Sequence, residues 1–306
     1  MSAYLLNAGF SFTGELAALV AAFLWAVSTV IFGRLGKRLS PLMLNLSKGL
    51  LAIAFVGLTL GLRGSQPSNI EPLALGLLLL SGIIGIGLGD TAYFNALNHL
   101  GARRVLLMES LAPPIAALIA WIFLAEVLSL SAWLGMLLTL LGVSWVISER
   151  VPDVNPVQAH PWRGVLWGLL AAFGQAIGVV LSRAALTGTG IDPLWSTLLR
   201  LVGGVITLLV LLLAQRRLGR DAQPLRSPRL VGVVVVAAVL GTYLALWLQQ
   251  TALKFAPTGI AQSLMATSPL FILPIALWLG DRVSLRALGG ASVALVGIWL
   301  LFVQHS

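Results

Sequence analysis

Long runs of apolar residues alternate along the chain with short segments that hold most of the charged residues and many of the prolines. Each run has about 20 residues, the length that an α-helix needs to cross a hydrocarbon core of about 30 Å. The runs are continuous, whereas transmembrane β-strands alternate apolar and polar residues. The pattern predicts an all-α membrane protein. Its ten predicted transmembrane helices are residues 15–33, 41–62, 72–97, 104–125, 130–148, 163–184, 193–215, 229–252, 257–280 and 284–303.

The composition supports this interpretation, because 58% of the 306 residues are hydrophobic and only 9% are charged. A soluble globular protein carries about 25% charged residues, so the composition excludes a soluble enzyme or binding module. It also excludes an intrinsically disordered chain, because such chains are poor in hydrophobic residues. The chain contains no cysteine, and this excludes disulfide bonds and thiol-based catalysis.

The basic residues in the loops and at the ends of the predicted helices are distributed unevenly between the two sides of the membrane. The loops after odd-numbered helices hold 14 Lys and Arg residues, whereas the other side holds 3, namely Arg63, Arg183 and Lys254. Lys and Arg concentrate on the cytoplasmic side, so we expect both termini to lie outside, in the periplasm of a bacterial-type inner membrane. The first 18 residues lack the basic cluster of a signal peptide, so the first helix is expected to remain in the mature protein.

The second half of the sequence repeats features of the first half at an offset of about 155 residues. The most informative aligned pairs are Pro113 with Pro269, Gly135 with Gly290, Gly142 with Gly297 and Lys48 with Arg200. We therefore expect two five-helix repeats, residues 1–150 and 151–306. Because five is an odd number, the second repeat enters the membrane upside down relative to the first. Inverted repeats are typical of alternating-access transporters, in which the substrate site lies near the midplane.

Two sets of motifs, one in each half, carry a family resemblance. The first set is Tyr93-Phe94-Asn95-Ala96-Leu97, Pro113, Leu124-Ala125-Glu126, Gly135 and Gly142, and the second is Ala252-Leu253, Pro269, Leu279-Gly280-Asp281, Gly290 and Gly297. Together they resemble the drug/metabolite transporter superfamily, specifically its ten-helix EamA-type exporters. The resemblance covers essentially the whole chain and implies the export of small metabolites. Amino acid exporters among these proteins, including one for aromatic amino acids, imply an amino acid substrate. A drug or a nucleotide-sugar-like metabolite is the alternative.

The paired glycines predict a contact between the last helices of the two halves. Gly135 and Gly142 are seven residues apart, as are Gly290 and Gly297. Seven residues make about two helical turns, so each pair forms a groove that allows close backbone approach. The alternative is that they reflect only the high frequency of glycine in membrane helices.

Four ionisable residues lie well inside predicted helices, away from the helix ends: Lys48, Asp90, Glu109 and Arg200. A charge at the bilayer centre costs about 2.5–3.5 kcal/mol on insertion scales, so each should face a partner or a cavity. The first three lie at similar depth, and they predict either a structural ion cluster or a carboxylate that serves as a gate or proton site. Arg200 has no acidic residue at the matching position of its own half. It predicts either a clamp for a substrate carboxylate or a cap for free backbone carbonyls.

Pro113 and Pro269 are predicted to kink the fourth and ninth helices. A proline leaves the carbonyl four residues earlier without its helical hydrogen bond, and these carbonyls belong to Glu109 and Met265. We expect both to line a central cavity.

A further group of residues is predicted either to hold a zwitterionic substrate or to bond neighbouring helices. Buried amides and phenols need hydrogen-bond partners, and aromatic faces hold apolar side chains. The group is Trp25, Tyr93, Gln175, Tyr243, Trp247, Gln249, Gln250, Gln262 and Ser263.

The remaining features separate a carrier from its rivals. The sequence has no phosphate-binding loop, and its three histidines are scattered, so we expect neither a cofactor nor a metal, and no enzymatic activity. A passive channel usually builds its pore from several subunits, whereas an inverted repeat favours a carrier. The expected partners are a small-molecule substrate and the lipid bilayer, with no nucleic acid. The carrier is expected to work as a monomer.

Overall fold

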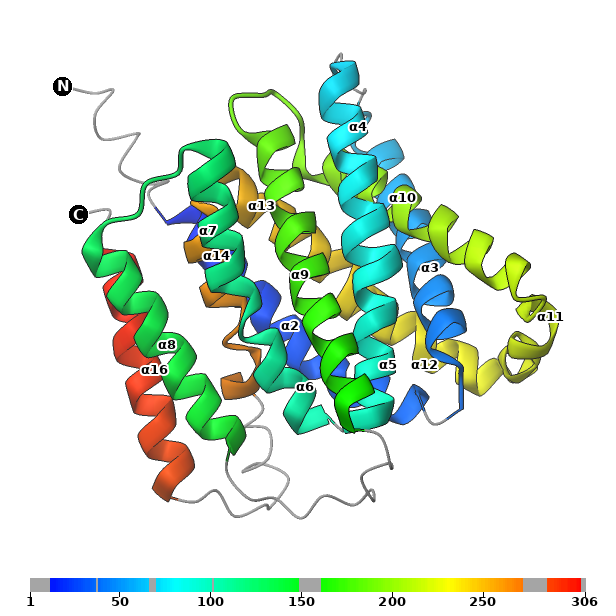
Figure 1. Ribbon diagram of the computed structural model, residues 1–306. Coiled ribbons are helices and arrows are strands. Elements are labelled where there is room, and N and C mark those ends of the chain that lie inside the picture. The colour runs from blue at the N-terminus through cyan, green and yellow to red at the C-terminus, as the bar shows by residue number, and fades with distance from the viewer. Residues whose placement is uncertain are drawn as a thin grey trace.

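The computed structural model describes residues 12–36, 38–65, 70–100, 102–148, 161–271 and 285–303. Within these ranges the chain forms helices and turns, without a strand, and the predicted all-α membrane fold is confirmed. Most of the helices cross the molecule between an upper and a lower side (Figure 1). Seven helical segments are long and apolar enough to cross a membrane, and Ala112–Leu124 and Arg286–Phe302 are shorter apolar helices.

The first repeat contains five helical units, of which the third and fourth are composite. They are α2 (Thr13–Leu35), α3 (Pro41–Leu62), α4–η2–α5 (Pro72–Ser81, Gly82–Gly89 and Asp90–Leu100), α6–α7 (Ala102–Glu109 and Ala112–Leu124) and α8 (Leu130–Ser148). The segment η2 is π-helical. The fourth predicted helix is thus interrupted just before Pro113.

The second repeat follows the same order. Its elements are α9 (Pro161–Leu186), α10 (Pro193–Ala214), α12–η4–α13 (Pro228–Ala238, Val239–Leu244 and Ala245–Phe255), α14 (Thr258–Met265) and α16 (Leu285–Val303). The segment η4 is also π-helical. Two short helices, α11 (Leu218–Asp221) and η3 (Gln223–Arg226), connect α10 to α12. The end of the ninth predicted helix, residues 272–280, lies outside the described residues, as do Pro274 and Asp281.

Equivalent caps begin the second helix of each repeat. The Ser40 hydroxyl accepts a hydrogen bond from the Met43 amide at 3.3 Å, and the Asp192 carboxylate accepts one from the Leu194 amide at 2.7 Å. A proline follows each cap, at a position where a helix has no use for its amide proton. These local signals explain why α3 and α10 begin where the sequence predicts.

The two halves pack against each other as an inverted repeat requires. Helix α2 contacts α13 and α14, and in the matching arrangement α9 contacts α5 and α7. Helices α3 and α10 also pack together. Because each half supplies the same elements to these contacts, the interface has approximate two-fold symmetry.

Helices α8 and α16 lie side by side at one edge of the molecule (Figure 1). A Cβ atom on Gly135 would lie 3.0 Å from the Gly297 carbonyl oxygen, and one on Gly142 would lie 2.5 Å from that of Gly290. The backbones therefore approach so closely that larger residues would collide. The glycine pairs thus lie in the contact between the last helices of the two halves.

Candidate substrate cavity

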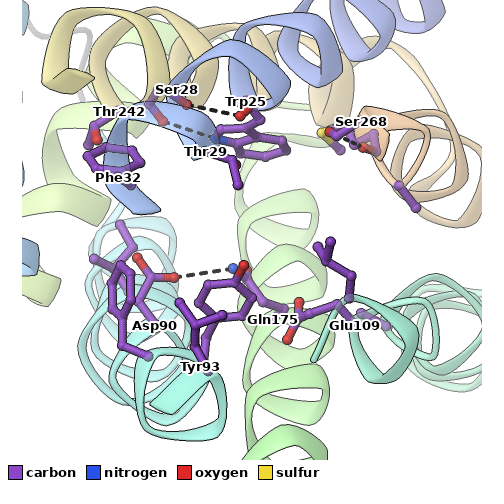
Figure 2. A pocket seen from close by; sticks show the side chains of 18 of the residues that line it. Trp25, Ser28, Thr29, Phe32, Asp90, Tyr93, Glu109, Gln175, Thr242 and Ser268 are labelled. Carbon is purple, nitrogen blue, oxygen red and sulfur yellow. Dashed lines mark hydrogen bonds between the residues drawn. The ribbon is translucent and has the colours of Figure 1, made fainter. Parts of the chain in front are cut away.

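A cavity of about 740 Å³ lies between the two halves, and residues of both halves line it. It has the size of a small-molecule site. Of the ten predicted substrate-binding residues, eight line this cavity: Trp25, Lys48, Asp90, Tyr93, Glu109, Gln175, Arg200 and Gln262. In Figure 2, Trp25 and Thr242 lie on the opposite side of the view from Asp90 and Tyr93.

Lys48 and Asp90 form an ion pair. The Lys48 Nζ atom lies 2.8 Å from Asp90 Oδ2, and the Gln175 amide donates to Asp90 Oδ1 at 3.3 Å. The ammonium also lies 5.6 Å and 5.4 Å from the ring centroids of Phe32 and Phe94, within reach of cation–π attraction. Both charges are therefore compensated inside the protein. Of the two hypotheses for this pair, the geometry favours the structural one.

Arg200 is the largest fully buried side chain in the described part of the chain, with 1% of its surface exposed. Its Nη1 atom donates to the Gln249 amide oxygen at 2.8 Å, whereas its Nε–H has no hydrogen-bond partner in the described part of the chain. Among the same residues, no carboxylate oxygen lies within 4.0 Å of the guanidinium. Arg200 thus brings a positive charge to the cavity that only a neutral group contacts.

Glu109 is the last residue of α6, where the fourth helical unit is interrupted. Its Oε1 atom is buried and makes no hydrogen bond to any residue that the structure describes. The repeat-equivalent Met265 ends α14 and lines the same cavity. The Met265 carbonyl accepts a hydrogen bond from the Ser268 hydroxyl at 2.9 Å. The interruptions near Pro113 and Pro269 thus place one acidic and one apolar side chain at equivalent positions.

Two other cavity residues differ in their remaining hydrogen-bonding capacity. The Trp25 indole N–H donates to the Gly241 carbonyl of η4 at 2.9 Å, so its only donor is already used. The Gln262 Nε2 atom has no partner among the described residues. Trp25 therefore offers a ring face to a ligand, whereas Gln262 still offers hydrogen-bond donors.

Tyr243 and Trp247 do not line the cavity, although the sequence grouped them with the substrate-binding candidates. Their rings stack with centroids 6.3 Å apart, and the Tyr243 hydroxyl lies 2.8 Å from that of Thr59. The Arg63 guanidinium lies 4.8 Å from the centroid of the Trp247 ring. Their contacts join α13 and η4 to α3 and the residue that follows it, which is the helix-bonding alternative.

One wall of the cavity was not predicted from the sequence. Ser28, Thr29 and Phe32 follow Trp25 on α2 and line the cavity with it. Their spacing of three, four and seven residues from Trp25 places them on one face of a helix. That spacing is a signal that could have found them. No comparable signal pointed to Thr242, which lies in the π-helical segment η4.

Among the residues that the structure describes, the lining of the cavity extends to one of the two sides of the molecule. Its lining extends to Gly36, Pro41, His99 and Ile147, which lie at or near the ends of α2, α3, α5 and α8. The ends of α5 and α8 are on the lower side in Figure 1. No residue of the upper helix ends, among those described, belongs to the lining. The cavity is therefore open towards the lower side.

Small residues and one ionic cluster close the upper side. Alanines of α2, α7 and α13 pack there into a core, together with Leu186 and Ile191. Glu126 binds the Arg183 side chain at 2.5 Å and the Thr258 amide at 2.8 Å. Arg183 also donates to the last carbonyls of α13, at 2.7 Å and 2.9 Å. This cluster connects the α7–α8 loop of the first repeat and α9 of the second repeat to the junction of α13 and α14.

An inverted pair of helical repeats around a cavity that opens on one side defines a multi-pass membrane transporter. The profile of the EamA-like transporter family matches residues 12–148 and 162–303, so the chain belongs to that family and carries its domain twice.

Three curated relatives match most of the chain. A WAT1-related protein of Arabidopsis thaliana is 27% identical over 78% of the chain and 70% of its own length. The uncharacterized transporter YdfC of Bacillus subtilis is 25% identical over 85% of the chain and 90% of its own length. An uncharacterized transporter of Archaeoglobus fulgidus is 24% identical over 94% and 97%.

One solved crystal structure superimposes on the chain with a TM-score of 0.74. It covers 94% of the chain and 95% of its own length at 17% identity. This likeness concerns the fold alone.

Proposed function

We propose that the protein exports a small zwitterionic metabolite, an amino acid and in the first instance an aromatic one, by alternating access. The observation that carries this proposal is that the cavity holds a guanidinium and a carboxyl group, each with a polar atom that has no hydrogen-bond partner among the described residues. Arg200 meets only a neutral amide, and Glu109 has a buried oxygen without a partner among the described residues. A zwitterion offers a carboxylate to the first residue and an ammonium group to the second. The rings of Trp25, Phe32 and Tyr93 then contact its side chain.

The direction of transport follows from the proposed orientation. With both termini outside, in a bacterial-type inner membrane, the lower side in Figure 1 is cytoplasmic. Arg216, Arg217, Arg220 and Arg226 lie between α10 and α12, and Arg229 lies in the first turn of α12, all on that side of the predicted topology. The cavity is then open to the cytoplasm and ready to accept a substrate for export. The repeats 1–150 and 151–306 are the two bodies whose relative motion opens the other side.

The proposal is tested with purified protein in liposomes, by uptake and counterflow of labelled amino acids, drugs and nucleotide sugars. We expect amino acids to be transported and trans substrate to accelerate their exchange, which a channel does not do. Arg200→Ala should reduce the affinity for amino acids at least about tenfold, because a hydrogen bond to a charged group is worth about 1.5–3 kcal/mol. Glu109→Gln should weaken the binding of amino acids but not the binding of the corresponding carboxylic acids that lack an amine.

Thermal unfolding of both variants provides the control for folding. Unchanged kinetics in well-folded Arg200→Ala would exclude the carboxylate clamp, and transport of drugs or nucleotide sugars alone would overturn the amino acid assignment. If Glu109→Gln altered only the pH dependence of transport, Glu109 would be a proton site instead.

A further inference from the structure

The two cavity cations occupy equivalent positions but have different partners. Lys48 and Arg200 lie on the second helix of their repeats, and each is hydrogen-bonded to the third helical unit of the same repeat. The partner of Lys48 is a carboxylate, Asp90, whereas the partner of Arg200 is an amide, Gln249. The first pair is electrically neutral, and the second keeps a full positive charge.

The surroundings of Arg200 fix the guanidinium but do not neutralise it. The π-helical segment η2 lies directly against α10, and a Cβ atom on Gly85 would approach Arg200 Nη2 to 3.0 Å. Gln249 is itself 2% exposed and lines the cavity beside Arg200. The neighbouring carboxylate of Asp90 already accepts bonds from Lys48 and Gln175. The charge of Arg200 therefore remains available to a ligand.

We infer that Gln249 determines the preference of the cavity for carboxylates. The inference rests on the proposed function, in which Arg200 binds the carboxylate of the substrate. The Gln249 amide oxygen holds the guanidinium in position through one neutral hydrogen bond and leaves the Nε–H free. A glutamate at this position would form an ion pair with the guanidinium and neutralise the positive charge that binds the substrate carboxylate. A carboxylate substrate would then have to displace an internal ion pair.

The test uses Gln249→Glu and compares L-phenylalanine with L-phenylalaninamide, which lacks only the carboxylate charge. Binding and transport of both compounds are measured with the full-length protein in liposomes. We expect the preference for phenylalanine over its amide to fall at least about tenfold. Transport of the amide should be maintained or increased, because the new carboxylate repels anions but not cations.

Gln250→Glu is the matched control, since it adds the same charge one residue further along α13. Gln250 is fully buried, accepts a hydrogen bond from Ser196 at 2.9 Å and does not line the cavity. The preference of the Gln250→Glu variant for phenylalanine over its amide should equal that of the wild-type protein. A second variant, Gln249→Met, removes the hydrogen bond but keeps the charge of Arg200. Gln249→Met should raise the KM for phenylalanine severalfold, and phenylalanine should still be preferred over its amide.

Three outcomes decide between the explanations. If Gln249 only satisfies a buried arginine, Gln249→Glu preserves that bond and leaves the selectivity unchanged, which overturns the inference. If Gln249→Glu does not fold, an unchanged KM in Gln249→Met overturns it as well. If the wild-type protein itself does not distinguish phenylalanine from its amide, the proposed function fails, whatever the variants show.

Discussion

The two repeats share their backbone features and differ in the side chains that face the cavity. Both have a π-helical segment in the third helical unit and an interruption before a proline in the fourth. At the cavity, however, Glu109 corresponds to Met265, and Asp90 corresponds to Leu246. The prolines and close glycine contacts preserve the architecture in both halves, whereas the chemistry has diverged. A symmetric scaffold thus surrounds an asymmetric site, which is what a substrate with two different ends requires.

The α8–α16 contact is one of the features that the two repeats share. A Cβ atom at position 142 would collide with the backbone of Gly290 and Ala294. Gly142→Leu should therefore destabilise the protein by about 3 kcal/mol or more, measured as a lower thermal unfolding midpoint in detergent. The control is Gly289→Leu in α16, where a Cβ atom meets nothing within 4 Å. Equal stability of the two variants would contradict the glycine contact.

The Lys48–Asp90 ion pair is a feature of the first repeat that the second repeat lacks. Lys48→Met should cost about 3 kcal/mol of unfolding free energy, because it leaves a largely buried carboxylate without its cation. The double variant Lys48→Met/Asp90→Leu copies the apolar Leu246 of the second repeat and should recover most of that loss. A double-mutant cycle measures the coupling. Additive losses would mean that the pair contributes no interaction of its own.

The smallest effect is expected at the closed side. Glu126→Gln removes the charge that holds Arg183, at a cost of about 1 kcal/mol, which is about a fivefold change in population. Because the chain lacks cysteine, a cysteine introduced at the buried Ala261 reports opening of this side by its labelling rate. Glu71→Gln, which changes an exposed glutamate, should leave that rate unchanged. A rate that does not rise in Glu126→Gln would show that the cluster does not keep this side closed.

The helices and their order could be predicted from the sequence, because each apolar run is long enough to cross a membrane. Such a run can be recognised without knowing which helices it packs against. The glycine and proline positions were also informative, since their effects on the backbone are local. The partner of Arg200 was not predictable, because it depends on which faces two helices turn towards each other. The direction of the Tyr243 side chain was not predictable either. Tyr243 lies inside the π-helical segment η4, where the spacing of an α-helix does not indicate which way a side chain points.

The π-helical segments also determine how the two repeats hold their cations. Hydrogen bonds in a π-helix join residues five apart instead of four. One residue of a helix corresponds to about 100° of rotation and 1.5 Å of rise. A shift of one residue in this register therefore rotates and translates the part of the helix that follows. Asp90 is the first residue after η2, and Gln249 follows η4 by five residues. The alignment of Asp90 with Lys48, and of Gln249 with Arg200, is therefore set by the backbone register of the π-helical segment that precedes each of the two residues.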